Sequence, residues 1–325
     1  MRQLLHRIRR RRSRLTVVPY LGYVIDRYDA PRARVRGRVL RHAAAGLEGS
    51  VPAWRTLAES LRWFVSREVV GVPVTVTSDQ ETVRCVSDDE GYVEACVAVA
   101  AGAGSRTRVR LQAAGAEAVV GEAAVLPDSR RPLVVSDIDD TVLVSAVTKP
   151  LSMVKLALMG DPSDREVVAG MDGLLRDLVG GSTVFYVSTS PWNLYHRLMA
   201  ILSWHDLPVG PLLLTDWGVS LKKWVTEPAL AYKRETITRL LEDFPNHQVV
   251  LVGDSGQHDA EAYAAVARRH PDRVRAVLIR EVQPSPHQQA RDLADQMRRD
   301  TVVPFVVGSP ETLAAAASDL GLVPR

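Results

Sequence analysis

Short apolar runs alternate with longer amphipathic segments through the second half of the chain. The runs are too short for helices, and they predict buried strands, whereas the segments between them carry apolar residues at helical spacing. Continuous apolar strands between helices are typical of a parallel sheet covered on both faces. The predicted strands are residues 133–136, 183–187, 212–214, 249–252, 274–279 and 303–307, and the predicted helices are residues 152–159, 170–179, 192–203, 234–244, 259–269 and 311–320.

The first part of the chain follows a different pattern, in which short β-prone runs are separated by turn residues such as Asp and Gly at 87–91. Such runs predict a small β-sandwich-like domain. Apolar residues from Trp54 to Phe64 recur at helical spacing and predict one helix within it. The predicted strands are residues 33–40, 73–77, 82–86, 92–98, 106–112 and 118–126.

The length of 325 residues is about twice that of a typical domain, so two domains are expected. A polar stretch bounded by prolines, residues 127–132, marks the boundary. The sequence therefore predicts a basic arm over residues 1–16, a β-rich domain over 17–126 and an α/β domain over 127–325.

The composition, 46% hydrophobic and 24% charged, excludes a mainly disordered or coiled-coil chain. The apolar runs are well short of the roughly 18 residues that span a bilayer. Cys85 and Cys96 are the only cysteines and form no CxxC pair, which excludes a disulfide framework and a structural zinc site. A reducing, cytoplasmic location is expected.

The net charge of +3 comes from the amino-terminal arm. Residues 1–14 hold seven of the 41 basic residues and no acid, which leaves 34 basic and 38 acidic residues elsewhere. Such an arm is either a solvated, disordered terminus or an electrostatic contact to an anionic surface. If it makes a contact, the partner expected is an anionic membrane surface, and no nucleic acid partner is expected.

Unusual polar residues follow three of the predicted strands. The first strand ends in Ser-Asp137-Ile-Asp139-Asp140-Thr141, and strand periodicity would place Asp137 and Asp139 on the same side. Two carboxylates so close repel each other unless a cation or a proton lies between them. The alternative is a solvated turn in which Asp140 caps a helix.

The second strand ends in Ser188-Thr189-Ser190-Pro191, where a hydroxyl and neighbouring backbone N–H groups could bind a phosphoryl oxygen. The alternative is an ordinary helix start, with Ser190 as the N-cap and Pro191 as the first helical residue.

The third strand ends in a glycine turn, Gly253-Asp254-Ser-Gly-Gln-His-Asp259. Asp254 is placed to bind a metal, and Asp259 is placed to cap a helix or orient a neighbour. Gly-Asp-Ser-Gly also surrounds the nucleophile of chymotrypsin-like proteases, but the α/β context excludes that assignment.

Ligands in parallel sheets bind at the carboxyl ends of the strands, so the three polar ends predict one site. Its carboxylates suit magnesium, and the lack of a His/Cys cluster argues against zinc.

The order and spacing of Asp137-x-Asp139-x-Thr141, Ser188, a lysine and Asp254 resemble the haloacid dehalogenase superfamily of phosphohydrolases. The lysine is assigned to Lys233, with Lys222 and Lys223 as alternatives. The segments 185–195, 215–218 and 253–259 further resemble the phosphatidate phosphatase catalytic-domain family of the actin-patch-associated type. The resemblance covers roughly residues 127–283, and the first domain resembles the one that precedes it in bacterial members. It implies an α/β fold with a haloacid dehalogenase-like Rossmannoid parallel sheet.

By this resemblance, Asp137 is the nucleophile that forms an aspartyl-phosphate, and Asp139 is the general acid and base. Asp137, the Asp139 carbonyl and Asp254 hold Mg²⁺. The resemblance further implies that Ser188, Thr189 and Lys233 bind the phosphoryl group, that Thr141 orients the loop and that Asp259 orients Lys233 or a metal-bound water.

Little chain separates the predicted elements, so no large cap domain is expected over the site, and an open site favours a bulky or surface-held substrate. The expected function is therefore magnesium-dependent hydrolysis of phosphatidate or a related lipid phosphate. The alternatives are a phosphatase of a metabolite, a nucleotide end or a phosphoprotein, and a non-catalytic binding protein.

Overall fold

The computed structural model describes residues 14–25, 30–42, 69–100, 104–126, 131–144, 162–215, 226–256, 258–282 and 287–323. The chain divides into two compact units, Met1–Val125 and Leu126–Arg325, and each unit is described by itself.

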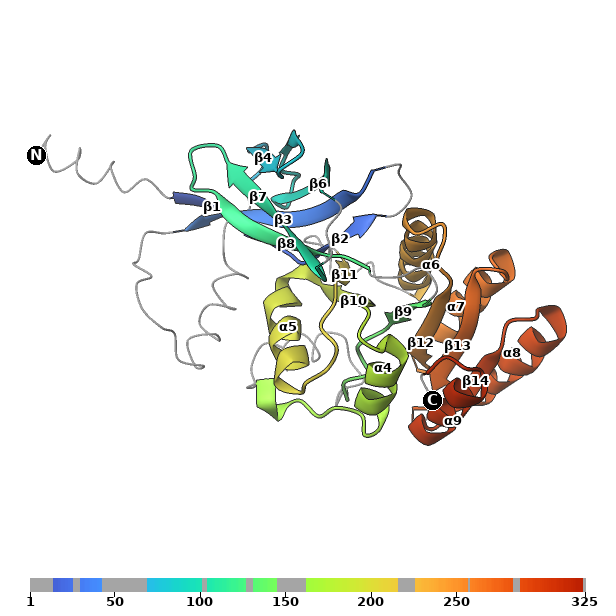
Figure 1. The fold of residues 1–325 in the computed structure, drawn as a ribbon. Helices are drawn as coiled ribbons and strands as arrows, with labels where there is room; N and C mark the ends of the chain where they lie inside the picture. The colour runs from blue at the N-terminus through green and yellow to red at the C-terminus, as the bar shows by residue number, and fades with distance from the viewer. Residues whose placement is uncertain are drawn as a thin grey trace, which may run out of the picture. The chain divides into compact units, whose positions relative to one another are not determined.

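The first unit is built of β-strands (Figure 1). They are paired in the order β1-β3-β2-β8-β7-β4-β5, and β6 pairs with β3. Alternate residues point into a valine-rich core, as Val74 and Val76 do in β4, because successive side chains of a strand face opposite sides. The strands are β1 (Arg14–Pro19), β2 (Gly22–Ile25), β3 (Arg32–His42), β4 (Pro73–Thr77), β5 (Thr82–Val86), β6 (Tyr92–Ala98), β7 (Arg106–Ala113) and β8 (Val119–Ala124).

The structure corrects the predictions for this unit at its amino-terminal end. The prediction that the arm extends to residue 16 is wrong, because β1 begins at Arg14 and pairs antiparallel with β3. β1 and β2 had not been predicted. The predicted helix over Trp54–Phe64 and residues 1–13 of the arm lie outside the described residues.

The second unit has a six-stranded sheet in the order β11-β10-β9-β12-β13-β14. Every neighbouring pair is parallel, as predicted. The strands are β9 (Leu133–Ser136), β10 (Val184–Pro191), β11 (Leu212–Thr215), β12 (Val249–Asp254), β13 (Val274–Arg280) and β14 (Phe305–Gly308). The predicted α/β class with a helix-flanked parallel sheet is confirmed.

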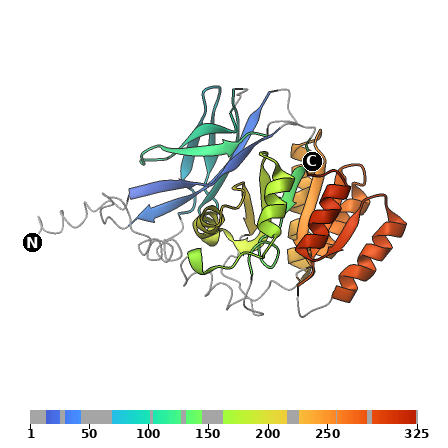
Figure 2. The ribbon, with the colours of Figure 1, turned by 60° about the horizontal axis from the view of Figure 1, so that its bottom comes forward.

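Helices lie against this sheet in two groups (Figures 1 and 2). α4 and α9 contact each other and the strands β9, β13 and β14, whereas α6, α7 and α8 contact one another and the strands β10, β12, β13 and β14. The helices are η1 (Pro162–Asp164), α4 (Met171–Val179), η2 (Trp192–Leu194), α5 (Tyr195–Trp204), α6 (Thr226–Asp243), α7 (Asp259–Arg269), α8 (His287–Asp300) and α9 (Pro310–Asp319).

The strand order places β9 in the middle, although it is the first strand of this unit in the sequence. The chain then proceeds outward to β10 and β11 on one side, and to β12, β13 and β14 on the other. Such a reversal leaves a crevice at the carboxyl ends of the central strands, which is where α/β proteins bind ligands.

Several element boundaries differ from the predictions. β10 continues to Pro191, four residues beyond the expected end, and α6 begins at Thr226, so that Lys233 is its eighth residue and does not lie at its start. α8 had not been predicted, and the predicted helix over 152–159 lies outside the described residues. Among the helices that the structure describes, none is long and apolar enough to cross a bilayer.

Candidate active site

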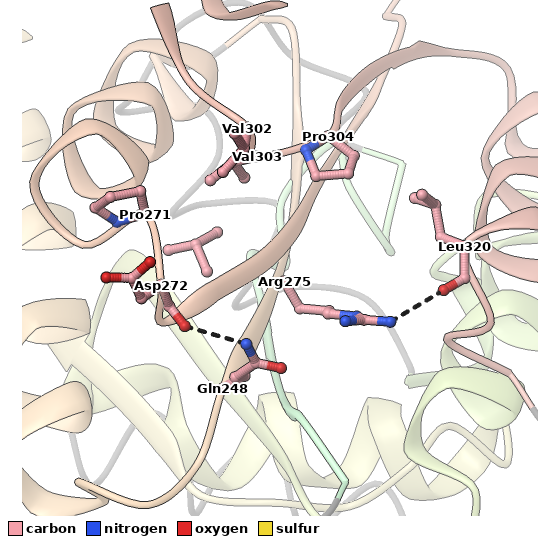
Figure 3. Close-up of a pocket in the computed structure, with 9 residues that line it drawn as sticks. Gln248, Pro271, Asp272, Arg275, Val302, Val303, Pro304 and Leu320 are labelled. Carbon is pink, nitrogen blue, oxygen red and sulfur yellow. Dashed lines mark hydrogen bonds between the residues drawn. The ribbon is translucent and has the colours of Figure 1, made fainter.

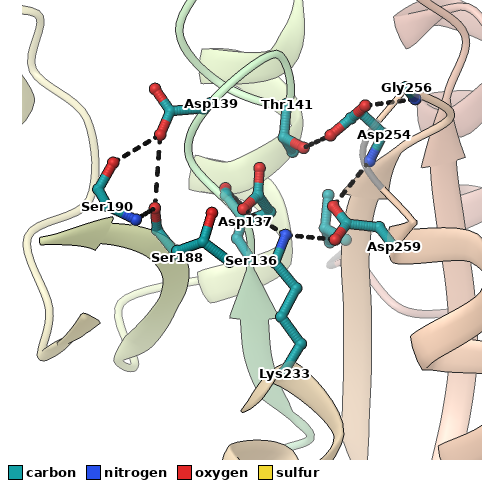
Figure 4. A network of polar contacts seen from close by, with 12 residues as sticks. Ser136, Asp137, Asp139, Thr141, Ser188, Ser190, Lys233, Asp254, Gly256 and Asp259 are labelled. Atoms are coloured by element: carbon teal, nitrogen blue, oxygen red, sulfur yellow. Dashed lines mark hydrogen bonds and ion pairs between the residues drawn. The ribbon is translucent and has the colours of Figure 1, made fainter. Parts of the chain in front are cut away.

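The central strand β9 delivers two buried carboxylates. Asp137 and Asp139 are 1% and 6% exposed. The Asp137 N–H donates to the Val252 carbonyl at 2.9 Å and so continues the pairing with β12. Because β9 ends at Ser136, strand alternation does not set the direction of the two side chains. The Asp137 carboxylate points toward Lys233, and the Asp139 carboxylate points toward Ser188 and Ser190 (Figure 4).

Packing of α6 onto the sheet brings Lys233 to this point. The Tyr232 hydroxyl donates to the Leu214 carbonyl of β11 at 2.8 Å. Beyond the end of α6, the Phe244 ring packs against the Phe185 ring of β10 with centroids 5.6 Å apart, a contact worth about 1 kcal/mol beyond burial. These contacts at both ends of the helix fix the backbone from which Lys233 extends.

Lys233 is itself 2% exposed and lies between two acids. Its Nζ donates to Asp137 Oδ1 at 2.7 Å and to Asp259 Oδ1. A buried ammonium is stable only when it is paired and hydrogen-bonded, and both conditions hold. Lys222 and Lys223, the alternatives to Lys233, lie outside the described residues.

β12 and the turn after it supply the other two acids. Asp259, at the start of α7, accepts the Asp254 N–H at 3.2 Å while it holds Lys233. Asp254 accepts the Gly256 N–H at 2.5 Å and the Thr141 hydroxyl at 3.5 Å. A Cβ on Gly253 would lie 2.7 Å from the Asp259 side chain, so glycine is required for this close approach.

Two serines of β10 face Asp139. The Ser190 hydroxyl donates to Asp139 Oδ2 at 2.8 Å, and the Ser188 hydroxyl reaches the same oxygen at 3.4 Å. Ser190 had been considered only as a helix N-cap, but β10 continues past it and the short helix η2 has no side-chain cap. Thr189 lies between the two serines, and its carbonyl accepts the Thr215 hydroxyl at 2.6 Å. By strand alternation the Thr189 side chain lies on the other face of β10, away from Asp139.

The loop after β9 is held by a residue that the sequence analysis did not select. Asp140 has φ 58° and is therefore in the left-handed region, and its N–H donates to the Leu143 carbonyl at 2.8 Å. Arg280, at the end of β13, donates to the Asp140 carbonyl through Nε at 2.7 Å and through Nη2. Asp140 does not cap a helix, and the acidic loop is anchored to β13, which lies two strands away from β9 in the sheet.

The acids of this site fit a hard cation. Oxygen atoms of Asp137, Asp254 and Asp259 lie within 4.8 Å of one another. Asp137 Oδ2 is buried and has no hydrogen-bond partner, although a buried carboxylate oxygen costs free energy unless something binds it. An all-oxygen donor set suits Mg²⁺. The residues present therefore fit the predicted metal.

The electrostatics of the cluster follow from its burial. Desolvation raises the pKa of Asp137 to about 8 against the attraction of Lys233, and desolvation and the neighbouring acids raise the pKa of Asp254 well above its ordinary range. Burial alone would lower the pKa of Lys233, but Asp137 and Asp259 raise it, so the ammonium stays charged. A divalent cation would balance the remaining negative charge.

The structure thus brings together Asp137, Asp139, Thr141, Ser188, Lys233, Asp254 and Asp259, all of which the sequence analysis had selected. Thr189 is present on the same strand but not in this network. Ser190 and Arg280 are additional members.

A hollow of about 440 Å³ lies elsewhere in the unit, at the amino ends of the strands (Figure 3). Gln248 and Arg275 at its rim donate to the backbone carbonyls of Asp272 and Leu320 at 3.1 and 3.5 Å. Because these contacts are structural and the acidic cluster lies at the carboxyl ends, this hollow is not the site of the chemistry.

The model of the family described as "Phosphatidate phosphatase APP1, catalytic domain" matches residues 132–281, which include every member of the cluster. Residues 132–281 of this chain are therefore similar to that catalytic-domain family. The resemblance read from the motifs is confirmed for this segment.

Two curated relatives come from yeasts. Phosphatidate phosphatase APP1 of Saccharomyces cerevisiae is 32% identical over 149 residues, which are 45% of this chain and 25% of the yeast protein. An uncharacterized protein of Schizosaccharomyces pombe is 29% identical over 168 residues, 51% of this chain and 27% of its own. This chain therefore spans about a quarter of the length of the curated relatives that it matches.

Among solved structures, a carbohydrate acetylesterase from Xanthomonas citri aligns with 93% of this chain and 75% of its own at 12% identity. The TM-score of 0.34 is too low to carry an argument about fold. The APP1 catalytic-domain match is thus the comparison that bears on function.

Proposed function

We propose that this chain is a magnesium-dependent phosphomonoester hydrolase that acts on phosphatidate or a related lipid phosphate through an aspartyl-phosphate intermediate. The α/β unit over residues 127–325 carries the reaction on a haloacid dehalogenase-like fold. The observation that supports this proposal best is the environment of the two carboxylate oxygens of Asp137. One of its carboxylate oxygens is held by Lys233, and the other is buried without a hydrogen-bond partner.

Asp137 acts as the nucleophile. Lys233 fixes its Oδ1, which leaves Oδ2 to attack phosphorus and form a P–O bond to the carboxylate. The ammonium also lies beside the transferring phosphoryl group, where it offsets the charge that develops on its oxygens. Asp259 positions this ammonium because it binds Nζ and the Asp254 N–H together.

Asp139 acts as general acid and base. It gives a proton to the leaving oxygen as the P–O bond to the alcohol breaks. It then takes a proton from the water that attacks the aspartyl-phosphate, which releases inorganic phosphate and restores Asp137. Ser188 donates to a phosphoryl oxygen, and Thr141 steadies Asp254.

The Asp137 and Asp254 carboxylates and the Asp139 carbonyl would hold Mg²⁺. When bound, the ion supplies neutralisation of the repulsion between the phosphate and the carboxylates. The cluster of buried acids, with an all-oxygen donor set, supports this assignment.

The lipid substrate is inferred from the APP1 catalytic-domain match over residues 132–281. The test is phosphate release from phosphatidate in detergent micelles with and without Mg²⁺, with Asp137→Asn as the control. Magnesium-dependent release that the variant loses supports the proposal. Turnover of a small phosphate ester without turnover of phosphatidate would keep the mechanism and reject the lipid. Release from neither substrate would reject the proposal that the protein is a phosphatase and would favour a non-catalytic binding protein.

A lipid substrate places the protein at the surface of a membrane. The seven arginines of residues 1–14 suit anionic lipid, at about 1 kcal/mol for each charge near the surface. Co-sedimentation with phosphatidate-containing vesicles, with and without residues 1–13, tests this contact. Equal binding by both forms would reject a role for the arm, and no binding by either form would reject the cytoplasmic, membrane-peripheral location that we propose.

A further inference from the structure

Asp139 receives its shortest described hydrogen bond from a residue to which no role is assigned above. The Ser190 hydroxyl donates to Asp139 Oδ2 at 2.8 Å, while the Ser188 hydroxyl lies 3.4 Å from the same atom (Figure 4). Ser188 Oγ also accepts the Ser190 N–H at 3.0 Å. The two hydroxyls are therefore not equivalent, because the donor that binds Asp139 well is Ser190.

The position of Ser190 is fixed by strand pairing. β10 continues to Pro191, which pairs with Thr215 of β11. The Thr215 hydroxyl bonds the carbonyls of Thr189 at 2.6 Å and Ser190 at 3.4 Å. Ser190 is 9% exposed. Its single hydroxyl hydrogen is thus directed at Asp139 by a rigid part of the sheet, as positioning of a catalytic group requires.

We propose that Ser190 is a positioning residue that holds the Asp139 carboxyl for proton transfer to the leaving oxygen, and that Ser188 is the hydroxyl that turns to the phosphoryl group. This inference rests on the proposed function. Because the Ser190 hydroxyl binds Oδ2 at 2.8 Å, it sets the orientation of the Asp139 carboxyl toward the leaving oxygen as the P–O bond to the alcohol breaks.

The role of Ser190 can be separated from general damage by the chemistry of the leaving group. Para-nitrophenolate leaves without a proton, whereas a benzyl alkoxide requires one. We compare kcat/KM for para-nitrophenyl phosphate, benzyl phosphate and micellar phosphatidate. This parameter covers the steps up to phosphoryl transfer to Asp137, so hydrolysis of the intermediate does not enter it. Ser190→Ala is expected to lower kcat/KM about tenfold or more for the two alkyl esters and less than about threefold for the nitrophenyl ester.

Two further variants and one measurement complete the test. Ser190→Thr retains the hydroxyl and is expected to restore the ratio between the two small esters. Tyr186→Phe removes a hydroxyl that donates to the Pro208 carbonyl at 2.9 Å, nearer the start of β10 and without touching Asp139, and it is expected to leave that ratio unchanged. Thermal unfolding of each variant establishes that it is folded.

The outcomes are distinct. An equal loss on both small esters in Ser190→Ala would overturn the inference and leave the proposed function intact. A changed ratio in Tyr186→Phe would also overturn it, because the effect would then not depend on the bond to Asp139. Failure of the unmodified protein to release phosphate from any ester would overturn the proposed function itself.

Discussion

Replacement of Asp254 by Asn is expected to abolish the reaction and to make the metal-free protein more stable. Asp254 is buried beside two other carboxylates and one ammonium, and its pKa is raised well above the ordinary range by burial and by Asp259 and Asp137. Asn has the same shape. Its oxygen can accept the Gly256 N–H and its amide can donate to the Thr141 hydroxyl, so the hydrogen bonds of the site survive.

The size of the effect follows from the geometry. Two unit charges 4.8 Å apart interact by about 3 kcal/mol at an effective dielectric constant of about 20. Asp254 is repelled by Asp137 and Asp259 and attracted by Lys233, which leaves about one such repulsion uncompensated. Partial protonation of the acids reduces this repulsion further, so the free energy of unfolding is expected to increase by about 1–3 kcal/mol. The midpoint of thermal unfolding should rise by about 2–4 °C for each kcal/mol in a unit of this size.

The assay is thermal unfolding in a chelator and in excess Mg²⁺, together with phosphate release. The unmodified protein should gain about 2.7 kcal/mol when Mg²⁺ is present at about 100 times its Kd, whereas Asp254→Asn should gain little. Asp319→Asn, at an exposed position on α9, is the control and should change neither midpoint. A lower midpoint for Asp254→Asn than for the unmodified protein in chelator would refute the reasoning, because the acids would then not repel one another.

Three further predictions concern other parts of the same unit. In chelator, the free energy of unfolding should increase as the pH falls from about 8 toward about 5. The pKa of Asp137 is raised to about 8, so over this range the folded state binds a proton that the unfolded chain does not. Thermal midpoints measured across this range check the prediction, and an equal dependence of the midpoint on pH in Asp137→Asn would contradict it. Arg280→Leu removes both donors to the Asp140 carbonyl, and it should lower the free energy of unfolding by about 1–3 kcal/mol and lower kcat/KM. Arg280→Lys should recover part of both losses. Unchanged unfolding and kinetics would mean that the loop keeps its conformation without Arg280. Gly210→Ala would place a Cβ 1.8 Å from the Val184 carbonyl oxygen and should cost about 3 kcal/mol in chemical denaturation, whereas a loss under about 1 kcal/mol would mean that the strand end moves easily.

The sheet of the second unit was predictable because its strands are buried on both faces. Residues 133–136 and 249–252 are continuous apolar runs with no competing helical spacing, and the structure forms strands there. α8 gave a weaker signal, because Ala290, Leu293, Ala294 and Met297 recur at helical spacing within a mostly polar segment. It buries only Ala290, Ala294 and Met297 among its described side chains, and two of these are too small to mark an apolar face.

The acids of the site were found for a related reason, since they lie in the turns that follow two predicted strands. Ser190 was misread because Ser-Pro is a strong local signal for a helix start, whereas the backbone there follows the pairing of Pro191 with Thr215. Arg280 was missed because its contact to Asp140 spans 140 positions and leaves no trace in local spacing. Local patterns thus located the strand ends but not the contacts made between them.

The central place of β9 has a consequence for how the protein is made. Its residues, three of them apolar, leave the ribosome before either neighbouring strand exists. Thr141 and Asp254 are 113 positions apart, so at roughly 5–20 residues per second β12 is completed about 6–23 seconds after β9. During this interval β9 and the acids that follow it remain unpaired on the side where β12 will bind. Conditions that slow translation in this stretch would therefore lower the yield of active protein without any change in its sequence.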